Sequence, residues 1–254
     1  MKALYEKNEL GFALVSIAAY CFLQSLANCL NGPIGVAYSA SAVFVWAQAL
    51  VLWRFVRKGG LIRRYGLCRA RISARQALYY LPLAVLATRN LWNGAAMEQP
   101  LAGTIACVIC MLGVGFVEEL IFRGLLFCAI EREKPRAAIV ISSVTFGLGH
   151  ILNLFNGSGM TLWENLLQIA GAMLMGFLFV ILFHRGGSLL PCIATHAGLN
   201  ALSAFSRSAD LTAGRELIFD LILFALAAGY LLWLAKTLPK PPEQTAYNET
   251  RGSN

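Results

Sequence analysis

The sequence has few charged residues for its length: aspartate, glutamate, lysine and arginine together make up 13% of its 254 positions. A soluble protein of this size carries about a quarter. Hydrophobic residues make up 58% of the chain, and the mean hydropathy is +0.63. This composition excludes an ordinary soluble globular domain and indicates a chain that folds within a lipid bilayer.

The sequence shows no internal repeat and no second domain. Instead, apolar runs long enough to cross a hydrocarbon core of about 30 Å follow one another along the chain. We therefore predict an all-α fold, a polytopic transmembrane helix bundle. About eight spans are expected, at residues 11–29, 33–53, 77–92, 101–130, 137–156, 162–183, 188–204 and 216–235. The third and seventh are short and the fourth is long, so we expect tilt or a break.

Acidic residues are also scarce, 13 against 21 lysines and arginines, which gives a net charge of +8. The excess of basic residues lies in alternate loops, as in the cytoplasmic loops of membrane proteins. We therefore expect both termini to be cytoplasmic, in the inner membrane of a bacterium, with the lipid bilayer and no nucleic acid as a partner. The basic residues are Arg54, Arg57, Lys58, Arg63, Arg64, Arg69, Arg71 and Arg75 after span two, Arg132, Lys134 and Arg136 after span four, Arg185 after span six, and Lys236 and Lys240 after span eight.

The seven cysteines do not form the paired motifs of a metal site. Cys107 and Cys110 make a CxxC, but they lie inside an apolar span with no second pair nearby. Cysteine in such a place behaves as a small hydrophobic residue. We expect this structural role for all seven.

The two ends of the chain are predicted to be a retained first helix and a disordered tail. The stretch "LANC" at 26–29 resembles a lipoprotein cleavage site, but Asn28 fits poorly before a cleaved bond and more spans follow, so we expect the first helix to be retained. The tail is rich in proline and polar residues and is expected to be disordered. The expected parts are N-terminal helices with a basic loop at 1–100, a catalytic core at 101–204, a last helix at 205–237 and the tail at 238–254.

Three ionisable side chains interrupt the fourth span. Glu118, Glu119 and Arg123 stand where a membrane helix usually carries Leu or Val. An ionised side chain at a helix centre costs about 2.5–3.5 kcal/mol, so these residues need partners. Glu119 and Arg123 are four residues apart, share a helix face and can pair. Glu118 has no such partner, which makes it a plausible general base.

Two later spans carry polar pairs at the same spacing. Phe146 and His150 are four residues apart in the fifth span, and His196 and Asn200 are four apart in the seventh. Residues at i and i+4 share a helix face. Glu118 and His150 each lie about 20 Å from the cytoplasmic ends of their helices, and His196 lies about 12 Å in. The sequence therefore predicts a single pocket built from three helices.

These motifs resemble those of the CAAX prenyl endopeptidase and bacteriocin-processing family of intramembrane proteases. The family has Glu-Glu-x-x-x-Arg, Phe-x-x-x-His and a His followed four residues later by Asn or Asp. Here they read Glu118-Glu119-x-x-x-Arg123, Phe146-x-x-x-His150 and His196-x-x-x-Asn200, in order and without departure. The resemblance covers about residues 101–204.

The resemblance implies a role for each residue. Glu118 and His150 would polarise a water for attack on a peptide carbonyl, and His196 and Asn200 would stabilise the oxyanion. Arg123 would hold Glu119, while Phe146 would shape the pocket wall. The implied substrate is a membrane-embedded protein or peptide, which could be lipidated or anchored at its C-terminus. The sequence does not select one substrate or an oligomeric state.

Three alternatives remain open at this stage. Glu118, His150 and His196 could bind zinc, but the sequence has no HExxH and the candidates come from separate helices, so we expect no metal or other cofactor. A non-catalytic immunity or scaffold protein could use the same fold. A proton-coupled transporter is a further alternative, but its polar clusters would be expected in both halves of the chain.

Four other ionisable residues are expected to lie at the membrane interfaces rather than in the pocket: Arg89, Glu164, His184 and Asp220.

Overall fold

The computed structural model describes residues 1–69, 76–156 and 159–238. Within these ranges the regular structure is helical, and the one pairing of extended residues is an isolated bridge between Ala95 and Ser206. The predicted all-α class is therefore confirmed. The expectations for Arg71, Arg75, Lys240 and the tail beyond residue 238 lie outside the described residues.

Six helices in the described part of the chain are long and apolar enough to cross a membrane. They correspond to predicted spans one, two, four, five, six and eight. In chain order they are α2 (Glu9–Ile34), α3 (Ser39–Lys58), the continuous run of α5 (Leu101–Glu119), η3 (Leu120–Phe127) and α6 (Cys128–Glu131), then α7 (Pro135–Gly149) with η4 (His150–Leu154), α8 (Leu162–Gly186) and α10 (Ala213–Thr237).

The third and seventh predicted spans form shorter helices, so the number eight stays a prediction. The third predicted span contains η1 (Gln76–Tyr80), α4 (Leu81–Ala87) and η2 (Arg89–Leu91), and the seventh contains α9 (Leu190–Leu202). Two further short elements are α1 (Lys2–Lys7) and η5 (Ser203–Phe205).

The first two helices meet later in the chain than predicted. The apolar runs predicted a boundary between the first two helices near residues 30–32, whereas α2 continues to Ile34. Gly35 ends it in the left-handed conformation, with φ of 76°, which glycine adopts without steric cost. Tyr38 also has a positive φ, and α3 begins directly after it. The turn between the two helices therefore begins at Gly35, after the predicted boundary.

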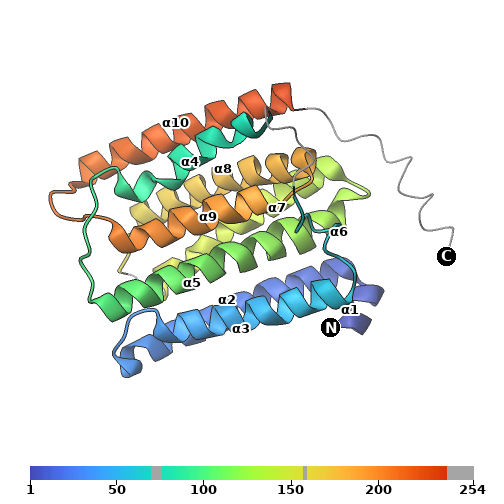
Figure 1. Cartoon of the computed structure of the whole chain (residues 1–254), viewed down its shortest axis with the longest axis horizontal. Helices are drawn as coiled ribbons and strands as arrows, with labels where there is room; N and C mark the ends of the chain where they lie inside the picture. The colour runs from blue at the N-terminus through green and yellow to red at the C-terminus, as the bar shows by residue number, and fades with distance from the viewer. Residues whose placement is uncertain (70–75, 157–158, 239–254) are drawn as a thin grey trace.

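The helices run along a common direction in one bundle (Figure 1). In the view of Figure 1, α2 and α3 form one side, α4 and α10 form the opposite side, and α5, α7, α8 and α9 lie between them. α5 packs against both α3 and α9, while α7 packs against α8. The middle layer thus contains all three predicted motifs.

Several of the predicted cytoplasmic segments gather at one end of the bundle. Arg64, in the loop after α3, forms an ion pair with Glu9 at the start of α2, and Arg132 lies 4.0 Å from the same carboxylate. Arg185, at the end of α8, donates hydrogen bonds to backbone carbonyls at the end of α10, at 2.7 Å for Ala235. This clustering agrees with the predicted topology, whereas the side of the membrane that this end faces stays a prediction.

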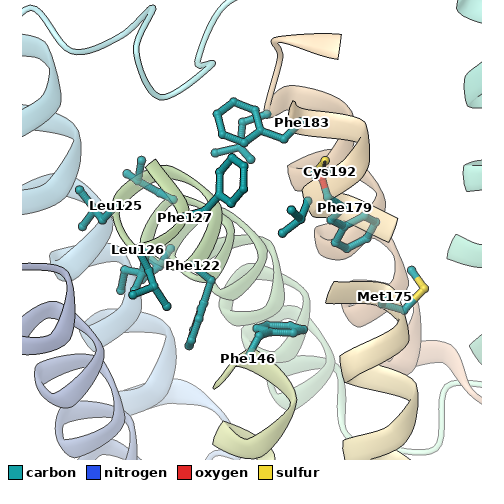
Figure 2. Close-up of a cluster of buried hydrophobic side chains, with 14 of the residues drawn as sticks. Phe122, Leu125, Leu126, Phe127, Phe146, Met175, Phe179, Phe183 and Cys192 are labelled. Atoms are coloured by element: carbon teal, nitrogen blue, oxygen red, sulfur yellow. Dashed lines mark hydrogen bonds between the residues drawn. The ribbon is translucent and has the colours of Figure 1, made fainter. Parts of the chain in front are cut away.

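The long helix changes its winding next to the motif. η3 is a π-helix in which every residue from Leu120 to Phe127 is buried. A π segment inserts extra residues into a helical turn and occurs often at functional sites. Figure 2 shows the aromatic side chains of η3 packed toward α7 and α8, with Phe122 and Phe146 in edge contact at 5.2 Å between ring centroids. Ser142 of α7 donates to the Phe122 carbonyl at 2.8 Å. The fourth span, for which tilt or a break was expected, is therefore a continuous helix whose winding changes in a buried π segment.

Candidate active site

The two adjacent glutamates have different surroundings, as their helix positions predicted. Glu119 is fully buried, and its Oε1 lies 3.0 Å from the Arg123 guanidinium. The Glu118 side chain keeps 14% of its surface exposed and makes no ion pair with arginine or lysine within the described ranges. Arg123 therefore pairs with Glu119, and Glu118 is the more accessible of the two carboxylates.

Arg123 is the largest side chain in the described residues that is completely buried. Its ion pair with Glu119 lacks hydrogen-bond geometry, because its N–H groups meet no acceptor in a suitable direction among the described residues. The guanidinium instead lies 4.0 Å above the Phe146 ring and 5.6 Å from the Phe179 ring centroid. A desolvated cation over an aromatic face gains about 2 kcal/mol. The ion pair and Phe146 thus hold the cation together.

His196 connects the two carboxylates. Its Nδ1 lies 2.8 Å from Glu119 Oε1, and its Nε2 lies 3.5 Å from Glu118 Oε2. An ionised carboxylate only accepts hydrogen bonds, so Nδ1 is the donor to Glu119. This contact fixes the orientation of the ring and directs Nε2 toward Glu118. At this separation of 3.5 Å, one water could hydrogen-bond to both atoms at about 2.8 Å.

His150 is half-buried at the start of η4. Its Nδ1 lies 3.1 Å from the Phe146 carbonyl oxygen, which can only accept, so Nδ1 carries the hydrogen and Nε2 is left as the acceptor. The Phe146 ring lies at 5.3 Å from the His150 ring and 5.6 Å from the His196 ring, between centroids. Asn165 of α8 donates to the His150 carbonyl at 2.8 Å. Phe146 therefore lies between the two histidines as a shared wall.

Asn200 lies one turn after His196 on α9 and is half-buried. Its backbone carbonyl accepts a hydrogen bond from Ser203, while its side chain has no hydrogen bond to any other described residue. Neither Asn200 nor His150 hydrogen-bonds to Glu118 in the part of the chain that the structure describes. The structure thus joins Glu118, Glu119, Arg123, His196 and Phe146 by direct contacts. The His150 ring meets Phe146 edge to face, and Asn200 lies farther along α9.

Two glycines bring the helices that carry the motifs into close contact. A Cβ at Gly115 would lie 2.6 Å from the backbone of Ala197, the residue after His196. A Cβ at Gly147 would lie 2.9 Å from the carbonyl of Ile169 on α8. Real Cβ atoms do not approach other atoms so closely. Gly115 therefore permits the α5–α9 distance at which Glu119 reaches His196.

One residue that no sequence motif indicated, Tyr20, also touches the site. Tyr20 of α2 donates a hydrogen bond of 2.6 Å to Glu118 Oε1. Its signal was a tyrosine on the same face of the first span as Gln24 and Asn28, at i+4 and i+8. That polar face was visible in the sequence, but the sequence did not indicate which helix it meets.

The four residues predicted to lie at the membrane interfaces bind to residues outside the site. Arg89 and Asp220 pair with each other at 2.6 Å, across 131 positions of the chain. His184 Nδ1 contacts a carboxylate oxygen of Glu131. Glu164 caps its own helix by accepting from the Thr161 backbone at 2.7 Å. Within the described residues none of these four contacts Glu118, so they lie outside the site, as expected.

The side chains that could bind a metal do not cluster in threes. Within residues 1–69, 76–156 and 159–238, no group of three or more His, Cys, Asp or Glu side chains has a metal-binding arrangement. The seven cysteines are free, with Cys107 and Cys110 both buried. The expectation of a site without a metal stays a prediction.

One comparison with known proteins gives a family match. Residues 100–202 match the Rce1-like family model, described as type II CAAX prenyl endopeptidase Rce1-like. This match confirms the resemblance that the three motifs indicated, and every motif residue lies inside it. Neither the search of curated proteins nor the search of solved structures gave a match.

Proposed function

We propose, on the premise that residues 100–202 form an Rce1-like core of the CAAX prenyl endopeptidase type, that the protein is an intramembrane endopeptidase. The observation that carries the proposal is the chain of contacts from Arg123 through Glu119 and His196 to Glu118. In this chain of contacts, the charge of the Glu119 carboxylate is balanced by Arg123. The Glu118 carboxylate is accessible and faces the oriented imidazole of His196. This is the division of roles that general acid–base hydrolysis requires.

In the proposed reaction, Glu118 removes a proton from a water molecule whose oxygen attacks the carbonyl carbon of the peptide bond. His150, with Nε2 as its free acceptor, helps to polarise this water. The attack forms a C–O bond and places a negative charge on the carbonyl oxygen. The tetrahedral intermediate then breaks the C–N bond, and the proton held by Glu118 passes to the leaving amine. The products are a carboxylic acid and an amine, which ionise to a carboxylate and an ammonium.

Stabilisation of the oxyanion falls to His196 and Asn200 in this proposal. This role requires His196 to carry a proton on both ring nitrogens before the attack, with Nδ1 donating to Glu119 and Nε2 donating to the oxyanion. A single preorganised donor of this kind is worth about 3 kcal/mol. Asn200 supplies the second donor, since its amide makes no competing hydrogen bond with the described residues.

The proposed substrate is a protein or peptide held in the membrane, including one with a lipid attached near its C-terminus. Glu118 lies within a helix run of 31 residues, Leu101–Glu131, that is long enough to span a bilayer. A water-soluble chain would have to enter that environment without help, whereas an anchored substrate is already there. We also propose that the protein lies in the bacterial inner membrane with both termini cytoplasmic.

The test uses the full chain reconstituted in liposomes. The probes are a farnesylated peptide with a CAAX terminus, the same peptide without the lipid, and a single-span transmembrane peptide. Hydrolysis in H₂¹⁸O should place one ¹⁸O atom in the new carboxylate of at least one anchored probe, detected by mass spectrometry. A Glu118→Gln variant is the control and should give no product. A folded wild-type protein that cleaves none of the probes would contradict the proposal and favour the non-catalytic alternative.

A further inference from the structure

We propose that Tyr20 of α2 is a positioning residue of this active site, which orients the Glu118 carboxylate. The proposal rests on the proposed endopeptidase function. Tyr20 lies in the first hundred residues, outside the matched segment 100–202, so it adds a helix that the family match does not include.

The contact between the two side chains is direct and polar. The Tyr20 hydroxyl donates to Glu118 Oε1 at 2.6 Å, across 98 positions of the chain. The length is that of a charge-assisted bond between a hydroxyl and a carboxylate, which is about twice as strong as a bond between neutral groups. Tyr20 is 9% exposed, so water competes little for its hydroxyl.

The hydrogen bond makes the two oxygens of Glu118 different. Oε1 accepts from Tyr20, whereas Oε2 faces His196 Nε2 at 3.5 Å. The terminal torsion of a glutamate is broad and nearly two-fold, so a free carboxylate would rotate through many orientations. Tyr20 selects the one in which Oε2 is directed toward His196 Nε2, where the water of the proposed reaction would bind. It therefore acts through Glu118, without touching the substrate.

The position of Tyr20 is itself fixed by a polar face on α2. Gln24, one turn farther on, donates to Gln48 of α3 at 2.9 Å. Asn28, another turn on, accepts from Ser41 of α3 at 2.9 Å. α2 also packs against the π segment η3 that follows Glu119. These contacts hold α2 in the rotation that directs Tyr20 at the carboxylate.

A purely structural hydrogen bond is the competing explanation. It would lower stability when removed but would not change the chemical step alone. Tyr20→Phe removes the hydroxyl and keeps the ring. The matched control is Tyr230→Phe, because Tyr230 is 6% exposed and its hydroxyl donates to the Tyr79 carbonyl, away from the site.

The kinetic test measures kcat and KM on the anchored probe that the wild-type protein cleaves. Loss of a hydrogen bond to a charged group should lower kcat by about 10- to 100-fold in Tyr20→Phe. KM should stay within about two-fold, since a residue that touches no substrate does not change its binding. Tyr230→Phe should keep the wild-type kcat. Equal kcat values in Tyr20→Phe and wild type would overturn the positioning role, as would a fall that appears in KM alone.

A spectroscopic readout separates this inference from the function on which it rests. The carboxylate stretching band of ¹³C-labelled glutamate should change in Tyr20→Phe, in the component that disappears in Glu118→Gln, and should not change in Tyr230→Phe. Absence of that change would show that the contact does not form and would overturn the inference while protease activity persists. If the band changes but the wild-type protein cleaves no probe, the proposed function fails and the positioning role fails with it.

Discussion

Glu119 and His196 are joined by a hydrogen bond of 2.8 Å across 77 positions of the chain. The bond links the π-wound end of one helix to a short helix that carries the other half of the site. Because Glu119 also pairs with Arg123, the guanidinium balances the charge of the carboxylate that contacts the imidazole. The adjacent glutamate, Glu118, therefore remains available as the general base of the proposed reaction.

Glu118→Gln should abolish hydrolysis and leave the protein folded. The amide keeps the volume and can still accept from Tyr20, but it cannot remove a proton from water. Loss of a general base lowers the rate by about 10²- to 10⁴-fold. Turnover of an anchored probe and thermal unfolding in liposomes measure the two effects. Normal turnover in this variant would show that the base is a different residue.

Glu119→Gln and Arg123→Ala should lower both expression and activity. Each change leaves a buried charge without its partner, and breaking a buried pair costs about 3–5 kcal/mol. The double variant Glu119→Gln/Arg123→Met should recover part of the stability without recovering activity, because His196 still lacks its carboxylate. Wild-type unfolding temperatures in both single variants would contradict the pairing.

His150→Ala and His196→Ala should each lower kcat/KM by at least about 100-fold. His184→Ala is the matched control, because its partner is Glu131 near the end of the bundle, and it should stay close to the wild-type rate. Similar losses for all three histidines would mean that the pocket has been assigned to the wrong part of the bundle.

Gly115→Ala should lower activity more than its single methyl group suggests. The new Cβ would lie 2.6 Å from the backbone of Ala197, so α9 must move away and carry His196 with it. A misplacement of about 1 Å can cost about 100-fold in rate. Gly229→Ala on α10 is the control, since no atom lies within 4 Å of its added Cβ. If both alanine variants are equally active, the close approach of α5 and α9 is not required.

The purified protein should contain no stoichiometric zinc, and its activity should survive prolonged treatment with a strong chelator. Use of Glu118 as a ligand would remove the accessible carboxylate from its role as base, and Glu118, His150 and His196 come from three separate helices. Elemental analysis and turnover after dialysis provide the measurements. Loss of activity that zinc alone restores would recast these three residues as ligands.

The sequence by itself determined the parts of the fold that depend on local spacing and composition. Hydropathy located the six long helices, because crossing a bilayer requires long apolar runs whatever their neighbours are. The four-residue spacing placed Glu119 with Arg123, since residues at i and i+4 meet within one helix. The three polar motifs also predicted which helices build the site.

Only the tertiary structure decided the contacts between helices. The helical period indicates which face is polar, but it carries no information about the rotation and depth at which two helices pack. The pairing of Arg89 with Asp220 and the contact of Tyr20 with Glu118 both join residues from distant helices. The same limit applied to His196, whose place between the two glutamates depends on the close α5–α9 packing at Gly115. Packing sets these distances, because shape and volume across the whole bundle must fit at once.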